Sequence, residues 1–125
     1  MKIKILIVED EIIVSKVYAE ELADNGFTVL MAKNGQEGLD LALKNQPQLI
    51  LLDILMPVMD GLSMMNKLRQ SGPYGKAVPI IILTNLSGGE EKIIASIMKN
   101  EPAHYLIKAD WDLKNVIKKI KEKLA

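Results

Sequence analysis

Short apolar runs recur along this chain, and longer segments with helical periodicity separate them. Each run holds three to five residues, mostly Ile, Leu and Val. Runs of this kind are typical of strands that a parallel sheet buries on both faces. We therefore predict five strands, over Ile5–Val8, Phe27–Met31, Leu49–Leu52, Ile80–Leu83 and Tyr105–Ile107.

The segments between the runs place apolar residues at helical spacing. The first spans Glu11–Asn25 and is followed by Gly26, a residue that commonly ends a helix. Gly72–Gly75 is expected to be a loop. The other predicted helices are Gln36–Asn45, Asp60 to about Gln70, Ser87 to about Asn100, and a last helix that Asp110 or Asp112 caps and whose inner face holds Leu113, Val116, Ile117, Ile120 and Leu124.

Regular alternation of strands and helices predicts the topology of the sheet. Such alternation indicates parallel strands joined by right-handed crossovers. In a flavodoxin-like strand order, 2-1-3-4-5, the first and third strands are neighbours at the point where the order reverses. We expect an α/β fold, a doubly wound sheet of five parallel strands with helices on both faces. At 125 residues, the chain is expected to be a single domain over residues 1–125.

Four polar residues lie at or just beyond the ends of the predicted strands. They are Asp10, Asp53, Thr84 and Lys108. In an open α/β sheet, ligands bind in the crevice beyond the carboxyl ends of the strands. Asp10 and Asp53 would face each other there, beside a hydroxyl and an ammonium group. This set suits a carboxylate that meets a divalent cation and a phosphoryl group.

The composition narrows the function classes. Sixteen basic residues balance sixteen acidic ones, which argues against a dominant nucleic-acid footprint. The chain has no Cys, so a disulfide framework and a thiolate metal site are excluded, and His104 is the only His. No run approaches the ~20 apolar residues of a membrane span. We expect a cytoplasmic protein that neither binds nucleic acid directly nor inserts into a membrane.

Four segments together resemble the receiver domain of two-component response regulators, of the chemotaxis-regulator kind. They are Val8–Glu11, Leu52–Gly61, Leu83–Thr84 and Tyr105–Lys108. The resemblance covers essentially the whole chain, and Asp53–Gly61 is its most specific stretch. It implies a phosphoacceptor in a His–Asp phosphorelay rather than an enzyme. Asp53 would attack the phosphorus of a phosphohistidine and form an acyl phosphate.

The same resemblance assigns roles around Asp53. A hard cation must offset the repulsion between carboxylate and phosphoryl group, and Mg²⁺ prefers oxygen ligands. Glu9, Asp10 and Asp53 would supply carboxylates, and the Leu55 backbone carbonyl is a further ligand by resemblance. Lys108 would neutralise phosphoryl oxygens, and Thr84 would hydrogen-bond one of them. Thr84 would also act in the switch, together with Tyr105, which matches the family's rotating aromatic residue.

Partners and signal lifetime are expectations of the same kind. The donor would be a histidine kinase or phosphotransfer protein. The output would be a protein target bound through the face formed by the Ser87–Asn100 helix, the fifth strand and the last helix, and a phosphorylation-dependent dimer is allowed. Because the chain ends after its last predicted helix, we expect no separate output domain unless the chain is a fragment of a longer regulator. Onward phosphotransfer is the alternative to protein contact as an output. Leu55 and Leu86 should exclude the hydrolytic water and make self-dephosphorylation slow.

Other interpretations of these residues stay open. Acids after a strand are usually a solvated helix start, and the lysines of the last helix either coat a solvated face or bind a partner. An aspartyl phosphatase would show multiple turnover, and a receiver-like scaffold would not take phosphate. Two residues depart from the family pattern. Ala109 stands where the family commonly has Pro, which predicts a trans Lys108–Ala109 bond. Asn85 stands where a small residue is usual and is expected either to narrow access to the phosphoryl group or to offer its amide to the phosphate.

Overall fold

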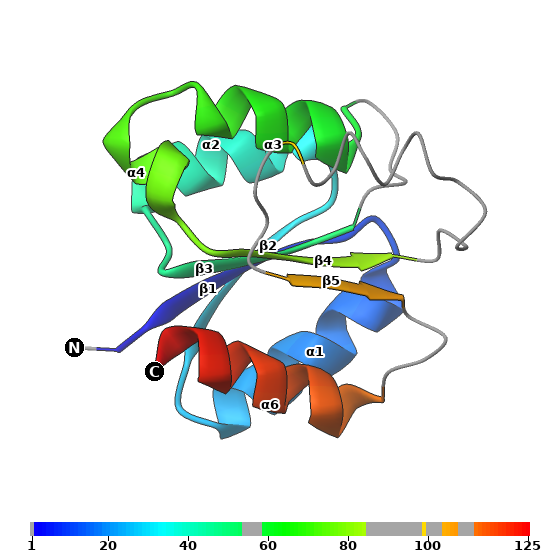
Figure 1. Ribbon diagram of the computed structural model, residues 1–125. Helices are drawn as coiled ribbons and strands as arrows, with labels where there is room; N and C mark the ends of the chain where they lie inside the picture. The colour runs from blue at the N-terminus through cyan, green and yellow to red at the C-terminus, as the bar shows by residue number, and fades with distance from the viewer. Residues whose placement is uncertain (1, 54–58, 85–98, 100–103, 108–111) are drawn as a thin grey trace.

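The computed structural model describes residues 2–53, 59–84, 99, 104–107 and 112–125. Within this part of the chain, five strands form one parallel sheet in the order β2-β1-β3-β4-β5, which confirms the predicted fold class (Figure 1). The observed bounds differ from the predicted ones by one residue at most. The strands are β1 Lys4–Val8, β2 Thr28–Ala32, β3 Leu49–Leu52, β4 Ile80–Thr84 and β5 His104–Ile107.

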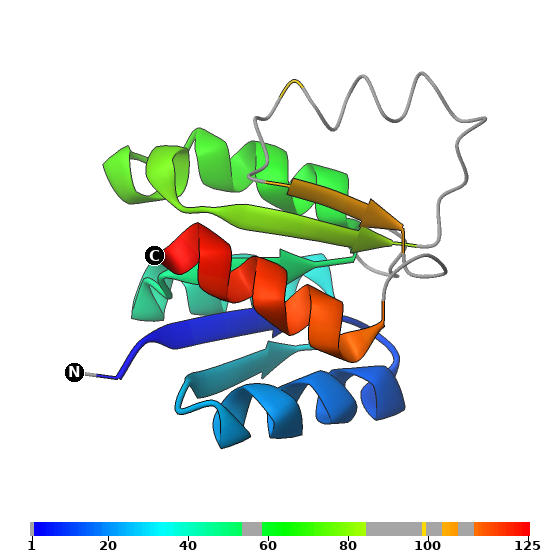
Figure 2. The same cartoon turned by 60° about the horizontal axis from the view of Figure 1, so that its bottom comes forward.

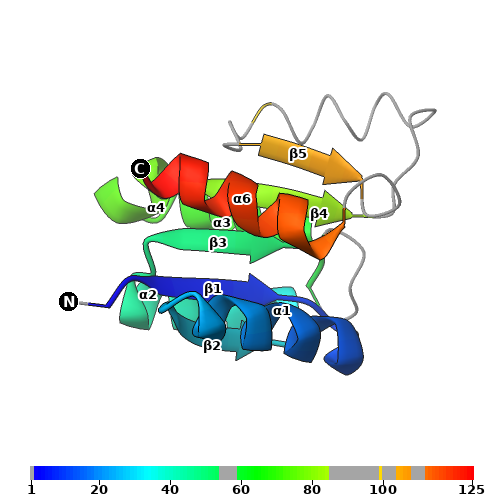
Figure 3. The same ribbon diagram turned by 90° about the horizontal axis from the view of Figure 1, so that it is seen from below.

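Helices cover both faces of this sheet. One layer holds α2, α3 and α4, and the other holds α1 and α6 (Figures 1 and 3). β1 begins and α6 ends at the same end of the sheet, opposite the arrowheads of the strands (Figure 2). The helix expected between Ser87 and Asn100 lies outside the described residues. The bounds of the helices are α1 Ile12–Asp24, α2 Gly35–Asn45, α3 Gly61–Arg69, α4 Pro73–Ala77 and α6 Leu113–Leu124.

Residues 5–8, 49–52 and 80–83 of the central strands are all apolar and buried, as expected of strands with both faces covered. Along β1, Leu6 and Val8 belong to the core under α2 and α3, whereas Ile5 and Ile7 belong to the core under α1 and α6. All four side chains are at most 2% exposed. The inner face predicted for the last helix is confirmed, with Val116, Ile117 and Ile120 buried and Leu113 and Leu124 packed against the same core.

Short polar side chains begin three of the helices. Asn34, Asp60 and Asp112 each accept a hydrogen bond from the backbone N–H three residues later, at 2.9, 2.8 and 2.9 Å. Such N-caps satisfy backbone donors that the first turn of a helix leaves unpaired. Of the two candidate caps for the last helix, the structure uses Asp112. At the end of α1, Gly26 has φ +91°, the left-handed conformation that favours glycine.

The segment expected to be a loop, Gly72–Gly75, contains the start of a short helix. α4 has Pro at its first position, where the fixed φ of Pro is compatible with a helix and its missing N–H costs nothing. The Tyr74 hydroxyl donates a hydrogen bond of 2.6 Å to the Pro47 carbonyl, and burial raises the pKa of Tyr74. Arg69 donates to the carbonyls of Gly75 and Val78 at 2.9 and 2.7 Å. These contacts stabilise a short helix that the local sequence does not predict.

None of the helices in the described residues is long and apolar enough to span a membrane.

Candidate functional site

The candidate site lies where β1 and β3 end side by side. Val8 is opposite Leu52 in the parallel ladder, so Glu9 and Asp53 are the next residues on neighbouring strands. The Asp53 N–H donates to the Val8 carbonyl at 3.0 Å, and the Glu9 N–H donates to the Ala32 carbonyl of β2 at 3.0 Å. The sheet therefore holds the backbone of both acids. Their positions follow from strand order and register rather than from a loop.

Three carboxylates converge at this edge. One carboxylate oxygen from each of Glu9, Asp10 and Asp53 lies within 4.8 Å of the other two. Glu9 and Asp53 are each only 6% exposed, and Asp10 is more open to solvent. Like charges at this separation repel, and a bound cation relieves the repulsion. The all-oxygen donor set with one open side fits Mg²⁺, which retains several water ligands.

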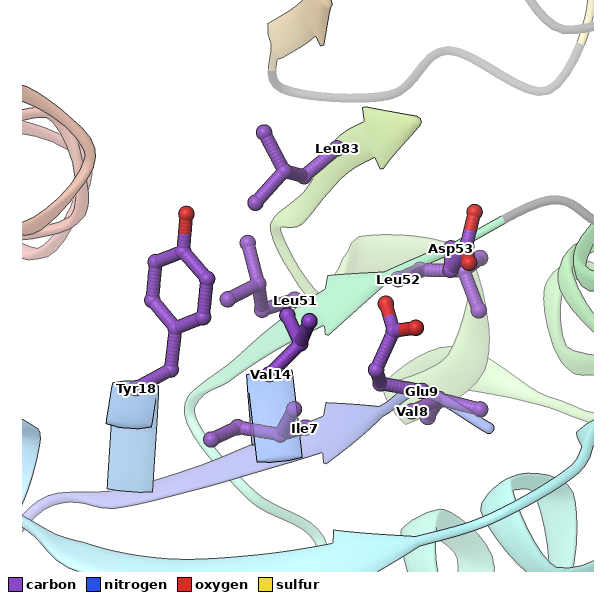
Figure 4. Close-up of a pocket in the computed structure, with 9 residues that line it drawn as sticks. All are labelled: Ile7, Val8, Glu9, Val14, Tyr18, Leu51, Leu52, Asp53 and Leu83. Atoms are coloured by element: carbon purple, nitrogen blue, oxygen red, sulfur yellow. The ribbon is translucent and has the colours of Figure 1, made fainter. Parts of the chain in front are cut away.

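A narrow cavity of about 10 Å³ separates the acids from the core. Glu9 and Asp53 lie at one end, and the side chains of Leu51, Leu83 and Tyr18 lie toward the other (Figure 4). A volume of this size holds about one water molecule. The remaining lining is apolar, so charges at the end of the cavity are screened less than charges in open solvent.

The residue that precedes α1 contacts the acid cluster. Glu11 precedes this helix, and its N–H donates to the Glu9 carboxylate at 3.3 Å. A carboxylate that accepts a hydrogen bond from a helix N-terminus is stabilised in its charged form. The contact restrains the Glu9 side chain, which lies beside Asp53 in Figure 4.

For the other predicted site residues, the structure describes the backbone at most. Thr84 ends β4, opposite Ile107 of β5, and Tyr105 lies within β5. The side chains of Thr84 and Tyr105 are not among those described. Five residues with predicted roles or properties also lie outside the described residues, namely Leu55, Asn85, Leu86, Lys108 and Ala109.

One contact beside the site was not predicted. Asn34 caps α2 and Gly35 is its first residue, one position before the predicted start at Gln36. The Gly35 N–H donates to the Met59 carbonyl at 2.8 Å. Met59 lies six residues beyond Asp53, so this bond connects α2 to the segment that follows the candidate phosphoacceptor. The Asn-Gly pair marks a turn or cap, but nothing local marks its distant partner.

Comparison with known proteins agrees with this geometry. The sequence model of the response regulator receiver domain matches residues 5–121. A probable transcriptional regulator, ycf29 of Pyropia yezoensis, is 40% identical over 84 residues, which are 67% of this chain and 37% of that protein. Response regulator MprA of Mycobacterium sp. (strain KMS) is 36% identical over 93 residues, 74% of this chain and 39% of that protein. The matches thus cover well under half of these relatives' lengths.

Solved structures show the same fold. Chemotaxis protein CheY4 of Vibrio cholerae superposes with a TM-score of 0.86 at 27% identity, over 98% of both chains. The receiver domain of a signal transduction histidine kinase from Syntrophus aciditrophicus superposes with a TM-score of 0.84 at 26% identity, over 95% of this chain and 87% of that one. The chain therefore belongs to the response regulator receiver domain family, whose members are phosphoacceptors in two-component signalling.

Proposed function

We propose that Asp53 of this chain accepts a phosphoryl group from a phosphohistidine in a Mg²⁺-dependent reaction. The observation that carries the proposal is the position of Asp53, buried at the end of β3 with two further carboxylates within 4.8 Å. An Asp53 oxygen attacks the phosphorus, the bond between phosphorus and the imidazole nitrogen breaks, and that nitrogen leaves with the electron pair. The product is an acyl phosphate on Asp53.

Glu9, Asp10 and Asp53 would hold Mg²⁺, together with the backbone carbonyl of Leu55. When bound, the ion neutralises charge on the carboxylates and on the incoming phosphoryl oxygens. The protein's own contribution is to keep these donors in place. The strand ladder fixes the backbone of Glu9 and Asp53, and the Glu11 N–H orients the Glu9 carboxylate.

Thr84, Lys108 and Tyr105 complete the proposed switch. Thr84 would hydrogen-bond one phosphoryl oxygen, and Lys108 would neutralise another. When Thr84 moves toward the phosphoryl group, Tyr105 would move into the space that Thr84 leaves. The pairing of Thr84 with Ile107, at the ends of β4 and β5, supports this. Phosphorylation adds close to two negative charges to the crevice. A charge change of this size can bias the adjoining strands toward a partner-binding conformation.

The output side of the proposal concerns the face formed by the Ser87–Asn100 segment, β5 and α6. Lys114, Lys118, Lys121 and Lys123 are exposed on α6. Lys119 forms an ion pair of 3.1 Å with Glu122. The hydrogen bond from Lys119 and its positive charge lower the pKa of Glu122. This basic surface would meet a protein target rather than nucleic acid, or a second copy after phosphorylation. We also infer one receiver unit over residues 1–125, acting in the cytoplasm as a slowly self-dephosphorylating switch rather than an enzyme.

The test is phosphorylation by acetyl phosphate in the presence of Mg²⁺, followed by mass spectrometry of the intact protein. Wild type should gain one phosphoryl group, and Asp53→Asn should gain none. Asp60→Asn is the matched control, because Asn caps a helix as well as Asp does and α3 should keep its N-cap. Asp60→Asn should be labelled like wild type. Labelling of Asp53→Asn at the wild-type rate, or no labelling of wild type, would contradict the proposal.

The same assay separates the alternatives. Continuous release of inorganic phosphate from a small phosphate ester over many turnovers would indicate an aspartyl phosphatase. Wild-type protein that is folded but never labelled would indicate a scaffold that uses the fold without phosphorylation.

A further inference from the structure

An open groove lies between the first turns of α1 and the end of β2, the edge strand of the sheet (Figure 3). The groove measures about 170 Å³, whereas the narrow cavity beside the acids measures about 10 Å³. One water molecule needs roughly 10–15 Å³. The groove therefore has room for a small organic molecule.

Two exposed apolar side chains line this groove. Ile12 of α1 is 63% exposed, and Met31 of β2 is 49% exposed. Ligand sites typically combine an apolar lining with a few polar groups that fix the orientation of the ligand. Ile12 and Met31 supply apolar surface that a hydrocarbon group would remove from water.

The groove also contains a buried hydroxyl. Ser15 of α1 lines the groove and is only 5% exposed. Its hydroxyl makes no hydrogen bond to another residue that the structure describes. Buried polar groups normally have a partner, because leaving one unpaired lowers stability. A ligand in the groove would supply that partner.

The charges around the groove favour an anionic ligand group. Lys33 is paired with Glu37 at 3.7 Å, and the Glu9 carboxylate belongs to the acid cluster. Lys16, the residue after Ser15, is exposed and forms no ion pair within the described ranges of the chain. The Lys16 ammonium group is therefore available to an anion that also meets the Ser15 hydroxyl.

We propose that this groove is a binding site for a small, free amphipathic carboxylate. Ser15 donates a hydrogen bond to the carboxylate, and Lys16 adds a charge-assisted one. A short aliphatic chain covers Ile12 and Met31. The site is separate from the proposed phosphorylation site, because Asp53 does not line the groove.

The experiment titrates isovalerate, a branched aliphatic carboxylate, into isotope-labelled protein without Mg²⁺ or a phosphodonor. The backbone amides of Ser15, Met31 and Lys33, followed by NMR, should shift to saturation. Two related probes separate the contributions. Isovaleramide keeps the shape but lacks the charge, and acetate keeps the charge but lacks the branched chain. Each should bind at least about 10-fold more weakly than isovalerate.

Two variants test the polar contacts. Ser15→Ala and Lys16→Met should each raise the dissociation constant of isovalerate by about 10-fold or more. The matched controls are Ser63→Ala and Lys44→Met, the same exchanges at exposed positions of α3 and α2 outside the groove, and both should bind like wild type. Without a probe, Ser15→Ala should be at least as stable to urea as wild type, because no described residue loses a hydrogen bond.

Three results would overturn the inference. The first is that none of the probes binds, or that all three bind equally. The second is that Ser15→Ala and Lys16→Met bind isovalerate as wild type does, which would place the probe elsewhere. The third is that isovalerate binds only after Mg²⁺ is added, which would make it a ligand of the ion rather than of the groove. These results do not depend on whether Asp53 accepts phosphate.

Discussion

Removing the charge of Asp53 should make the protein more stable when no metal is bound. Two like charges repel by 332/(εr) kcal/mol, where r is in Å. For oxygens within 4.8 Å of each other, each pair repels by at least about 0.9 kcal/mol at an ε of about 80 and about 3.5 kcal/mol at an ε of about 20. Asp53 faces both Glu9 and Asp10. With two such pairs, we expect Asp53→Asn to raise the free energy of unfolding by about 2 kcal/mol or more.

The measurement is urea unfolding at neutral pH and low ionic strength, with a chelator and then with Mg²⁺. Wild type should gain stability from Mg²⁺, by about 2.7 kcal/mol at a concentration 100 times its dissociation constant. Asp53→Asn lacks one carboxylate ligand and should gain much less, so the difference between the two proteins should shrink as Mg²⁺ is added. Asp24→Asn, a change to an exposed acid near the other end of α1, is the control and should show neither effect.

Either of two outcomes would refute this reasoning. In one, Asp53→Asn is no more stable than wild type in the chelator, which would mean that the carboxylates do not repel in the folded protein. In the other, Mg²⁺ stabilises both proteins equally, which would place the ion elsewhere.

Three further predictions concern other parts of the chain. Tyr74→Phe should lower the free energy of unfolding by about 1–3 kcal/mol, because the buried Pro47 carbonyl loses its donor. Because burial raises the pKa of Tyr74, wild type should lose stability as the pH rises above about 10, and urea unfolding of the Phe variant should show no such loss from this site. Leu55→Asn and Leu86→Glu should each shorten the lifetime of the acyl phosphate in a decay assay. If wild type loses phosphate as fast as these variants, the two leucines do not shield the acyl phosphate from water. A crystal structure should show a trans Lys108–Ala109 bond, since a cis bond without proline costs about 2.5–4 kcal/mol.

The strands could be predicted because two-sided burial leaves an uninterrupted apolar run, as in Ile5–Val8. Which side of α1 packs against the core could not be predicted. Ile12, Ile13 and Val17 are apolar and at helical spacing, yet they are 63%, 79% and 46% exposed. Leu22 is the buried residue of this helix, together with Ser15. Apolar residues occupy too wide an arc of α1 for periodicity alone to choose the inner side.

The candidate site shows a similar division. Asp10 and Asp53 could be placed at one edge because strand ends are visible in the sequence and parallel strands end together. Their proximity also needed the strand order, which alternation alone does not fix. The Gly35–Met59 bond could not be predicted, because it depends on the packing of α2 against a segment 24 positions away. The helix at Pro73–Ala77 was missed for a similar reason, since the Tyr74 hydroxyl bonds to Pro47, 27 positions away.

The alternation of side chains along β1 has a consequence for how this sequence can change. Leu6 and Ile7 are neighbours in the chain, but they belong to separate cores on opposite faces of the sheet. Substitutions on opposite faces change different clusters, so their effects on stability should couple less strongly than those of substitutions within one face. Side chains under one layer of helices can therefore change with less need for compensation under the other. Divergent relatives could alter a binding surface on one side while the opposite side stays as it was.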